Sequence, residues 1–197
     1  MTIGEGSSPS TAVHRSEAAR RDGARCAVLT ISDSRTAATD ESGDLIEQLL
    51  LAAGHTVVAR HLLPNEDAQI RGRVEEALGR DDVDAVFCTG GTGLGARDRT
   101  IDVVRPLLDR ELPGFGELFR MLSYHEQIGA AAMLSRALAG AARGRFVVIM
   151  PGSRAAVELA MTRLLVPELK HALRELKSKD APRRLLRHHR AAQPGGP

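Results

Sequence analysis

Apolar residues along the chain follow two patterns, short runs of strand length and longer runs with a helical period. The short runs span residues 26–31, 56–62, 84–88 and 145–150, and the run 26–31 is continuously apolar. Between and after them, apolar residues recur at helical spacing in residues 45–53, 70–78 and 156–164. Because strands that alternate with helices indicate βαβ units, we predict an α/β fold with a mostly parallel, doubly wound sheet and helices on both faces.

Other segments are less regular. Residues 101–108 and 115–122 predict two helices separated by the Pro- and Gly-containing break at 112–116, and Pro106 inside the first leaves its length open. Residues 133–144 are rich in Ala and Gly and fit either a strand or a helix. Gly54 stands where a glycine ends a helix, and Asp67 stands where a side chain caps the next one.

Composition divides the chain into three parts. Residues 1–24 contain almost no large apolar side chains, and we expect a disordered N-terminal arm. One domain follows over residues 25–176, and residues 177–197 form a basic flexible tail, with six Lys or Arg and one Asp in 177–190. A nucleic-acid binder would carry basic residues on its folded domain with aromatic side chains for stacking, whereas only 3% of the residues are aromatic. We therefore expect no nucleic-acid partner.

The cysteines and the hydropathy suggest a compartment. The two cysteines, Cys26 and Cys88, both lie in predicted strands and are expected to be reduced and buried. No stretch reaches the roughly 20 apolar residues of a membrane span, and the first residues lack the apolar core of a signal peptide. We therefore expect a cytoplasmic protein with no membrane partner.

Because the predicted strands are parallel, the turns that follow them are expected to meet at one rim. Ligands of such folds bind there, beyond the carboxyl ends of the strands. These turns are residues 32–43, 64–67, 90–98 and 151–153. The third contains four glycines within residues 90–95. Glycine allows close backbone approach, and successive N–H groups at a strand-to-helix turn bind anions. We expect a phosphate there, with a purely structural tight turn as the alternative.

Standard nucleotide motifs do not account for this turn. Gly90 and Gly95 have the P-loop spacing, but Ala96 and Arg97 replace the required Lys and Ser or Thr. The turn also fits G-x-G-x-x-A weakly, because the expected ribose-binding acid would have to end a second strand. Neither motif identifies the ligand.

Several side chains at the rim have two readings. Asp98 follows the glycines where a carboxylate could bind a Mg²⁺ held by phosphates, and it could equally cap the next helix. Ser153 is first an N-cap, although the N–H groups beside it could hold an anion. Arg35, Arg97 and Arg136 are candidate anion partners or solvated surface charges. The histidines show no metal-ligand spacing.

Four motifs together carry a family resemblance. They are TGGTG at residues 89–93 with Arg97 and Asp98, PGFGE at 113–117, SR at 135–136 with AG at 139–140, and MPGS at 150–153. In this order the chain resembles the molybdenum cofactor biosynthesis proteins MoaB and MogA over residues 25–176. The SDSR motif at 32–35 with DESG at 40–43 is closer to the MoaB branch.

The resemblance implies a three-layer αβα domain, commonly a homotrimer, that binds molybdopterin. In active members it transfers the adenylyl group of Mg·ATP to the phosphate of the pterin. It implies Mg²⁺ at Asp98, catalytic roles for Asp98 and Asn65, and ATP and molybdopterin as ligands. The substrate-binding residues that it implies are Ser32, Thr89, Gly90, Gly91, Thr92, Gly93, Glu117, Ser135, Pro151, Gly152 and Ser153.

The sequence departs from this pattern at Asn65. Active relatives carry an Asp on the loop after the second strand, whereas an Asn offers Mg²⁺ a carbonyl oxygen but no charge. Either Glu66 or Asp67 replaces that carboxylate, or the chain binds the pterin without turning it over. The sequence thus leaves two hypotheses, a molybdopterin adenylyltransferase and a weak or inactive molybdopterin-binding carrier, with a general nucleotide-binding domain as a weaker third.

Overall fold

The computed structural model of the protein describes residues 23–178 of the 197-residue chain. The strands are β1 Arg25–Ile31, β2 Thr56–Leu63, β3 Ala85–Thr89, β4 Arg110–Glu111, β5 Leu138–Ala142 and β6 Arg145–Met150. The α-helices are α2 Glu41–Ala52, α3 Asp67–Gly79, α4 Thr100–Val104, α5 Pro113–Ser123, α6 Arg154–Ala160 and α7 Val166–Lys177. The helical turn Met161–Leu165 joins α6 to α7. The tail beyond Ser178 and residues 1–22 of the predicted arm lie outside the described residues.

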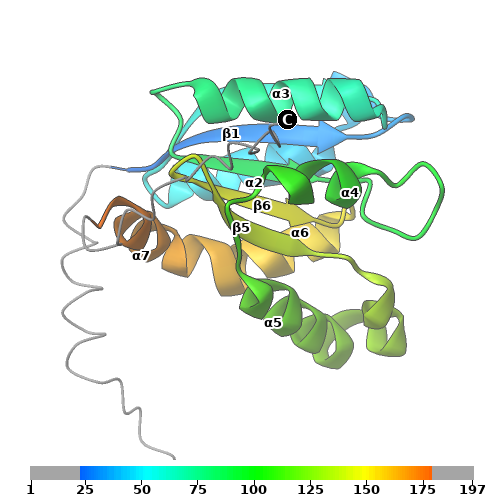
Figure 1. The fold of residues 1–197 in the computed structure, drawn as a ribbon. Coiled ribbons are helices and arrows are strands. Elements are labelled where there is room, and N and C mark those ends of the chain that lie inside the picture. Colours follow the sequence, from blue (N-terminus) through cyan, green and yellow to red (C-terminus); the bar gives the residue numbers. More distant parts are fainter. Residues whose placement is uncertain (1–22, 179–197) are drawn as a thin grey trace, which may run out of the picture.

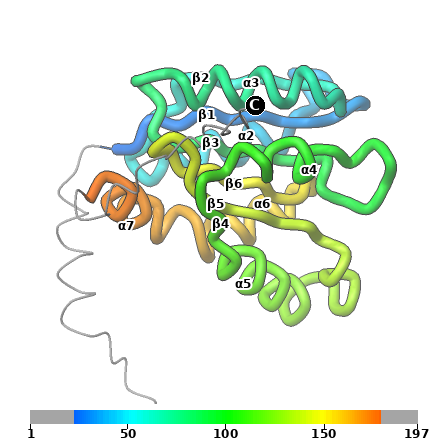
Figure 2. Tube along the Cα trace, viewed as in Figure 1, coloured from blue at the N-terminus to red at the C-terminus, as the bar shows by residue number. Residues whose placement is uncertain are grey.

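The strands form one six-stranded sheet in the order β2-β1-β3-β6-β5-β4. Figure 2 shows this order from β2 near the top to β4 lower down. Neighbouring strands β2, β1, β3 and β6 pair in parallel, while β5 is antiparallel to both β6 and β4. The predicted α/β fold with a mostly parallel sheet is confirmed.

Helices cover both faces of the sheet, which gives three layers (Figure 1). Side chains of a strand point alternately to opposite faces, and in β1 Val28 belongs to one buried cluster while Ala27 and Leu29 belong to the other. The first cluster packs against α2, α5, α6 and α7, and the second against α3 and α4. Continuous apolar runs were therefore the correct signal for strands buried on both faces.

Two irregular segments differ from their expected forms. The helix predicted over residues 101–108 is shorter, since α4 ends at Val104 and the 3-10 turn Arg105–Leu107 takes up Pro106. The ambiguous segment 133–144 contains β5, whose five residues are all buried. Their small side chains carry little strand preference, so pairing with β6 decides the conformation.

The helix caps agree with the sequence at one position and differ at another. Gly54 has φ +78° directly after the C-cap Ala53, as expected of a helix-ending glycine. Asp67 is not an N-cap, because the cap position of α3 is Glu66 and the carboxylate of Asp67 binds the guanidinium of Arg99 at 3.0 and 3.1 Å.

The ends of the domain extend slightly beyond the predicted boundaries. Ala24 is buried, and its N–H donates to Nδ1 of His55 at 3.0 Å. At the other end α7 continues to Lys177, whose ammonium group donates to Asp84 at 2.8 Å. Residues 24 and 177, assigned by composition to the arm and the tail, are thus part of the folded structure.

Cys26 and Cys88 are free and buried, as expected. Burial raises the pKa of each thiol to about 12, so both are unreactive at neutral pH. No helix within residues 23–178 is both long and apolar enough to cross a membrane.

Candidate functional site

The turns that follow the four parallel strands begin at the same level of the sheet. The strand register pairs Ile31 with Leu63, Thr30 with Thr89, and Thr89 with Met150. The loops after β1, β2, β3 and β6 consequently meet at one edge, and the loop between β3 and α4 projects at the right of Figure 1. The predicted rim is present.

The glycine turn packs closely against the neighbouring strand. Gly90 has φ +99°, and a Cβ there would lie 2.2 Å from the carbonyl oxygen of Ile31. Gly91 has φ +62°, and a Cβ there would lie 2.3 Å from Oγ1 of Thr100 and 2.6 Å from Oδ1 of Asn65. Only glycine meets both requirements, since it tolerates positive φ and has no Cβ.

The loop after β6 lies against this turn. Oγ1 of Thr89 donates to the carbonyl oxygen of Pro151 at 3.0 Å, and a Cβ on Gly152 would lie 3.1 Å from Cα of Gly90. Arg35 donates to the carbonyl oxygen of Gly152 at 2.6 Å, while Oγ of Ser153 caps α6 by accepting from the N–H of residue 156. The structure thus brings together Thr89, Gly90, Pro151, Gly152 and Ser153, all predicted to bind substrate.

Asp98 faces back into its own loop. Its Oδ2 accepts from the N–H of Gly95 at 3.1 Å, and Cβ atoms on Gly93 and Gly95 would lie within 2.8 Å of that oxygen. It does not cap α4, because the cap position is Arg99. The carboxylate of Asp98 is therefore held beside the predicted phosphate turn.

Arg136 binds two backbone carbonyl groups of the same loop. Nε donates to the carbonyl oxygen of Thr92 at 3.1 Å, and Nη2 donates to that of Asp98 at 2.6 Å. The remaining nitrogen, Nη1, contacts both carboxylate oxygens of Asp102 at 3.0 and 3.1 Å. The sequence left Arg136 open between an anion partner and a solvated surface charge, and in the structure its donors hold the loop.

Asn65 is bound by a residue to which the sequence gave no role. Its N–H donates to Oδ1 of Asp33 at 2.9 Å, and its Nδ2 donates to Oδ2 at 3.1 Å. The backbone hydrogen bond from Asn65 is the main cause that lowers the pKa of Asp33, and Arg97, 3.0 Å away, adds to it. Asp33 adjoins Ser32, but no pattern in the sequence connects it to a partner 32 residues further along the chain.

The two acidic neighbours of Asn65 point to other partners. Glu66 accepts from the side chain of Gln69 at 2.7 Å, and Asp67 is engaged by Arg99. Their contacts do not favour the alternative in which Glu66 or Asp67 replaces the missing carboxylate. The carboxylate next to Asn65 is that of Asp33.

Glu117 and Ser135 line a cavity of about 360 Å³ next to the glycine loop. Its wall also contains three arginines, Arg105, Arg120 and Arg136. Arg136 connects the cavity to the loop through its bonds to Thr92 and Asp98. The predicted substrate residues therefore form two adjoining groups, one at the phosphate turn and one in this charged cavity.

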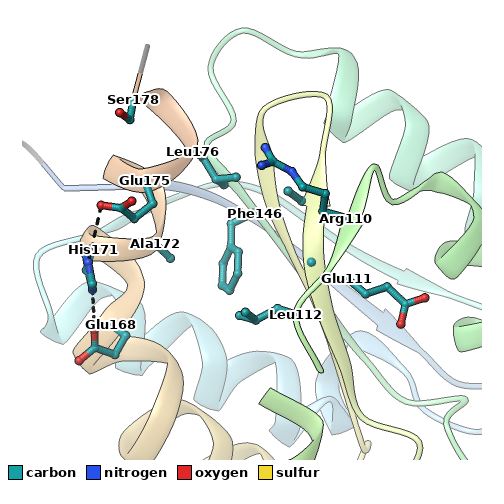
Figure 3. A pocket seen from close by; sticks show the side chains of 12 residues that line it. Arg110, Glu111, Leu112, Phe146, Glu168, His171, Ala172, Glu175, Leu176 and Ser178 are labelled. Atoms are coloured by element: carbon teal, nitrogen blue, oxygen red, sulfur yellow. Dashed lines mark hydrogen bonds and ion pairs between the residues drawn. The ribbon is translucent and has the colours of Figure 1, made fainter. Parts of the chain in front are cut away.

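A larger cavity lies elsewhere. This cavity of about 680 Å³ is lined by residues of β4 and α7. In Figure 3, Leu112 and Phe146 lie beside it, and His171 lies between Glu168 and Glu175. None of the predicted site residues lines it. Because its walls do not reach the glycine loop, we do not assign the site there.

A metal ion at the site would need ligands from outside the protein. Within residues 23–178 no three His, Cys, Asp or Glu side chains converge on one point. Asp98 offers one carboxylate, and Oδ1 of Asn65 and Oγ1 of Thr100 are buried oxygens without a hydrogen-bond partner. Oxygens of these kinds are ligands that Mg²⁺ takes together with phosphate and water, but Asn65 and Thr100 lie against Gly91 whereas Asp98 lies against Gly93 and Gly95.

Comparison with known proteins agrees with this geometry. Residues 27–171 match a family described as "Probable molybdopterin binding domain". Molybdenum cofactor biosynthesis protein B of Halalkalibacterium halodurans is 52% identical over 163 residues, which cover 83% of this chain and 95% of the relative. The Bacillus subtilis protein of the same name is 46% identical over 164 residues, with the same two coverages.

Solved structures give the same result. A crystal structure of a molybdenum cofactor biosynthesis protein B matches with a TM-score of 0.76 and 49% identity, covering 78% of this chain and 96% of the other. The tungsten cofactor synthesizing protein MoaB from Pyrococcus furiosus matches with a TM-score of 0.70 and 34% identity, covering 80% of this chain and 99% of the other.

Proposed function

The chain belongs to the MoaB/MogA family of molybdenum cofactor biosynthesis proteins, on the MoaB-like side, and we propose that it is a molybdopterin adenylyltransferase. The observation that supports this most is the position of Asp98. Its carboxylate accepts a hydrogen bond within the glycine turn, and Arg136, which binds the backbone of Asp98, also lines a cavity that contains charged side chains. A nucleotidyl transfer between two bound phosphates needs such an arrangement.

In the proposed reaction a phosphate oxygen of molybdopterin attacks the α-phosphorus of ATP. A new P–O–P bond forms, the bond from the α-phosphorus to the bridging oxygen breaks, and pyrophosphate leaves with that electron pair. The N–H groups of the glycine turn would bind phosphate oxygens, and Asp98 would hold Mg²⁺, which neutralises charge on the phosphates when bound. Positioning and charge neutralisation account for most of the catalysis in such transfers.

The pterin would occupy the cavity that Glu117 and Ser135 line. A pterin ring presents N–H groups on one edge, and a carboxylate such as that of Glu117 is a suitable acceptor for them. Arg120, on the same wall, would suit an anionic group of the ligand, whereas Arg136 holds the loop and Arg105 pairs with Glu111. Free, buried Cys26 and Cys88 fit the cytoplasm as the place of the reaction.

The direct test is to incubate the purified protein with molybdopterin and Mg·ATP and to measure adenylylated pterin and pyrophosphate. Asp98→Asn should lower the rate by about 100-fold or more, because one charged group at the transferring phosphate is lost. Asp82→Asn is the matched control, since Asp82 pairs with Arg80 before β3, at the opposite end of the sheet. A wild-type rate no higher than that of Asp98→Asn would refute the proposed adenylyltransferase activity.

The second candidate function is a catalytically weak molybdopterin-binding carrier. It is favoured by Asn65, because an amide stands where active relatives are expected to carry a carboxylate. The carrier predicts pterin binding without an ATP-dependent product, and a gain of activity in Asn65→Asp. Failure to bind the pterin at all would exclude both functions and leave a general nucleotide-binding domain.

We also propose that the protein forms a homotrimer. Large apolar side chains gather on and after α5, each about half exposed or more: Leu118, Met121, Tyr124, Ile128, Met133 and Leu134. Apolar groups on this scale favour association between subunits. Light scattering should give three times the chain mass, and Met121→Asp should reduce it; a monomeric wild type would refute the trimer.

A further inference from the structure

Asp33 and Asn65 form a matched pair of one carboxylate and one amide. Both oxygens of Asp33 accept hydrogen bonds from Asn65, one from the backbone N–H and one from Nδ2. The pair joins the loop after β1 to the loop after β2. Neither loop contributes to the hydrophobic core at this point, so these polar contacts determine where Asn65 lies.

The contact with Asp33 also determines which way the amide faces. A carboxylate can only accept, so the amide must turn its nitrogen toward Asp33. Its oxygen then faces the glycine turn, 2.6 Å from the place where a Cβ of Gly91 would be. That oxygen is buried and has no donor, and Oγ1 of Thr100 beside it also has no partner. A donor or a cation at the turn would complete both.

The pair carries one negative charge. An aspartate at position 65 would bring a second carboxylate to about 3.1 Å from Oδ2 of Asp33, where Nδ2 now lies. Two carboxylates at that distance repel each other, which disfavours ionisation of both at once. Asp33 is also bound to Arg97 at 3.0 Å, which connects the pair to the residue before Asp98.

We propose that Asp33 is a positioning residue of this site, which turns the oxygen of Asn65 toward the glycine turn and supplies the negative charge that Asn65 lacks. The role of the site in adenylyl transfer is the function proposed above, on which this inference rests. It explains how an amide can occupy position 65 in an active protein. In this chain the carboxylate stands one hydrogen bond away from Asn65, on Asp33.

The test is an exchange of the two side chains. Asp33→Asn leaves two amides, Asn65→Asp leaves two carboxylates, and the double variant Asp33→Asn with Asn65→Asp restores one of each. Asp67→Asn is the control, because Asp67 belongs to the same region and pairs with Arg99 instead. Each protein is assayed for adenylyl transfer and for binding of Mn²⁺·ATP, followed by the paramagnetic resonance signal of free Mn²⁺.

Asp33→Asn should weaken Mn²⁺·ATP binding by about 10-fold, the effect of losing one charge-assisted contact. The double variant should recover to within about 3-fold of the wild type. Asn65→Asp alone should not exceed wild-type activity, which distinguishes this inference from the carrier hypothesis. The control should bind like the wild type.

Two results would overturn the inference: an Asp33→Asn variant that binds Mn²⁺·ATP like the wild type, or a double variant no better than Asp33→Asn. If the wild type gives no adenylylated product, the proposed function fails. The metal-binding measurements still decide the role of Asp33, because they do not require turnover.

Discussion

Arg136 holds Asp98 by its backbone, since Nη2 of the arginine donates to the carbonyl oxygen of Asp98 at 2.6 Å. The carboxylate of Asp98 is consequently left for the glycine turn, where it accepts from the N–H of Gly95. One arginine thus fixes the loop without competing for the group that the proposed reaction needs.

Arg136→Lys should lower kcat/KM for adenylyl transfer by about 100-fold, because lysine cannot reproduce the three-directional contacts and the loop loses its position. Steady-state rates at varied Mg·ATP and saturating molybdopterin would measure kcat/KM for ATP. Arg163→Lys is the control, since Arg163 pairs with Glu126 outside the rim. Equal losses in both variants would contradict the assigned role.

Gly91→Ala should destabilise the protein by about 1–3 kcal/mol, because φ is positive and the methyl group would collide with Thr100 and Asn65. Urea unfolding would measure it. Gly72→Ala is the matched control: Gly72 lies inside α3 with nothing within 4 Å of its Cβ position, so the change should stabilise by about 0.5–1 kcal/mol. The prediction fails if Gly91→Ala is as stable as the wild type.

Asp84 should make the protein sensitive to acid. Burial by itself would raise the pKa of this carboxyl, but hydrogen bonds from Arg25 and Lys177 outweigh burial and lower the pKa overall. Because the folded pKa is the lower one, the stabilisation is present at neutral pH and is lost as the pH falls through and below about 3.9.

Asp84→Asn should therefore cost about 1–3 kcal/mol at pH 7, where charged hydrogen bonds are lost, and much less near pH 2. Urea unfolding of both proteins across this range would measure the difference. A difference that stays constant with pH would show that Asp84 contributes by packing alone.

His55 should add a second pH dependence at milder pH. Burial is the main cause that lowers the pKa of this imidazole, with a smaller effect from Lys170, and its Nδ1 accepts from the N–H of Ala24. A lowered folded pKa means that stability is full above about pH 6.5 and falls as the pH drops through that value. His55→Gln should remove this dependence in thermal unfolding between pH 8 and 5; a wild type with no change over that range would contradict it.

The sequence was sufficient for the parts of the fold that burial determines. Short apolar runs predicted β1, β2, β3 and β6, and the glycines predicted the turn after β3. It left β5 undecided between strand and helix, because residues Leu138–Ala142 are mostly small and become a strand by pairing with β6.

The polar contacts of the site could not be predicted in the same way. Asp33 meets Asn65 because the register of β1 and β2 aligns Ile31 with Leu63, and that register is a property of the sheet. Similarly, the sequence position of Asp98 fits a helix cap as well as a metal ligand. Its actual direction depends on the contacts of its loop with Arg136 and Gly95. Contacts between loops depend on strand positions that local patterns do not encode.

The antiparallel direction of β5 places the turn between β5 and β6 far from the rim. Because β5 enters the sheet at the rim, beside Ser135 and Arg136, and β6 returns to the same rim, the turn that joins them at Arg143 and Gly144 lies at the far end. Five or six strand residues separate that turn from the rim, roughly 17–20 Å. A fluorophore or a surface linker attached at this turn would leave the candidate site facing solution.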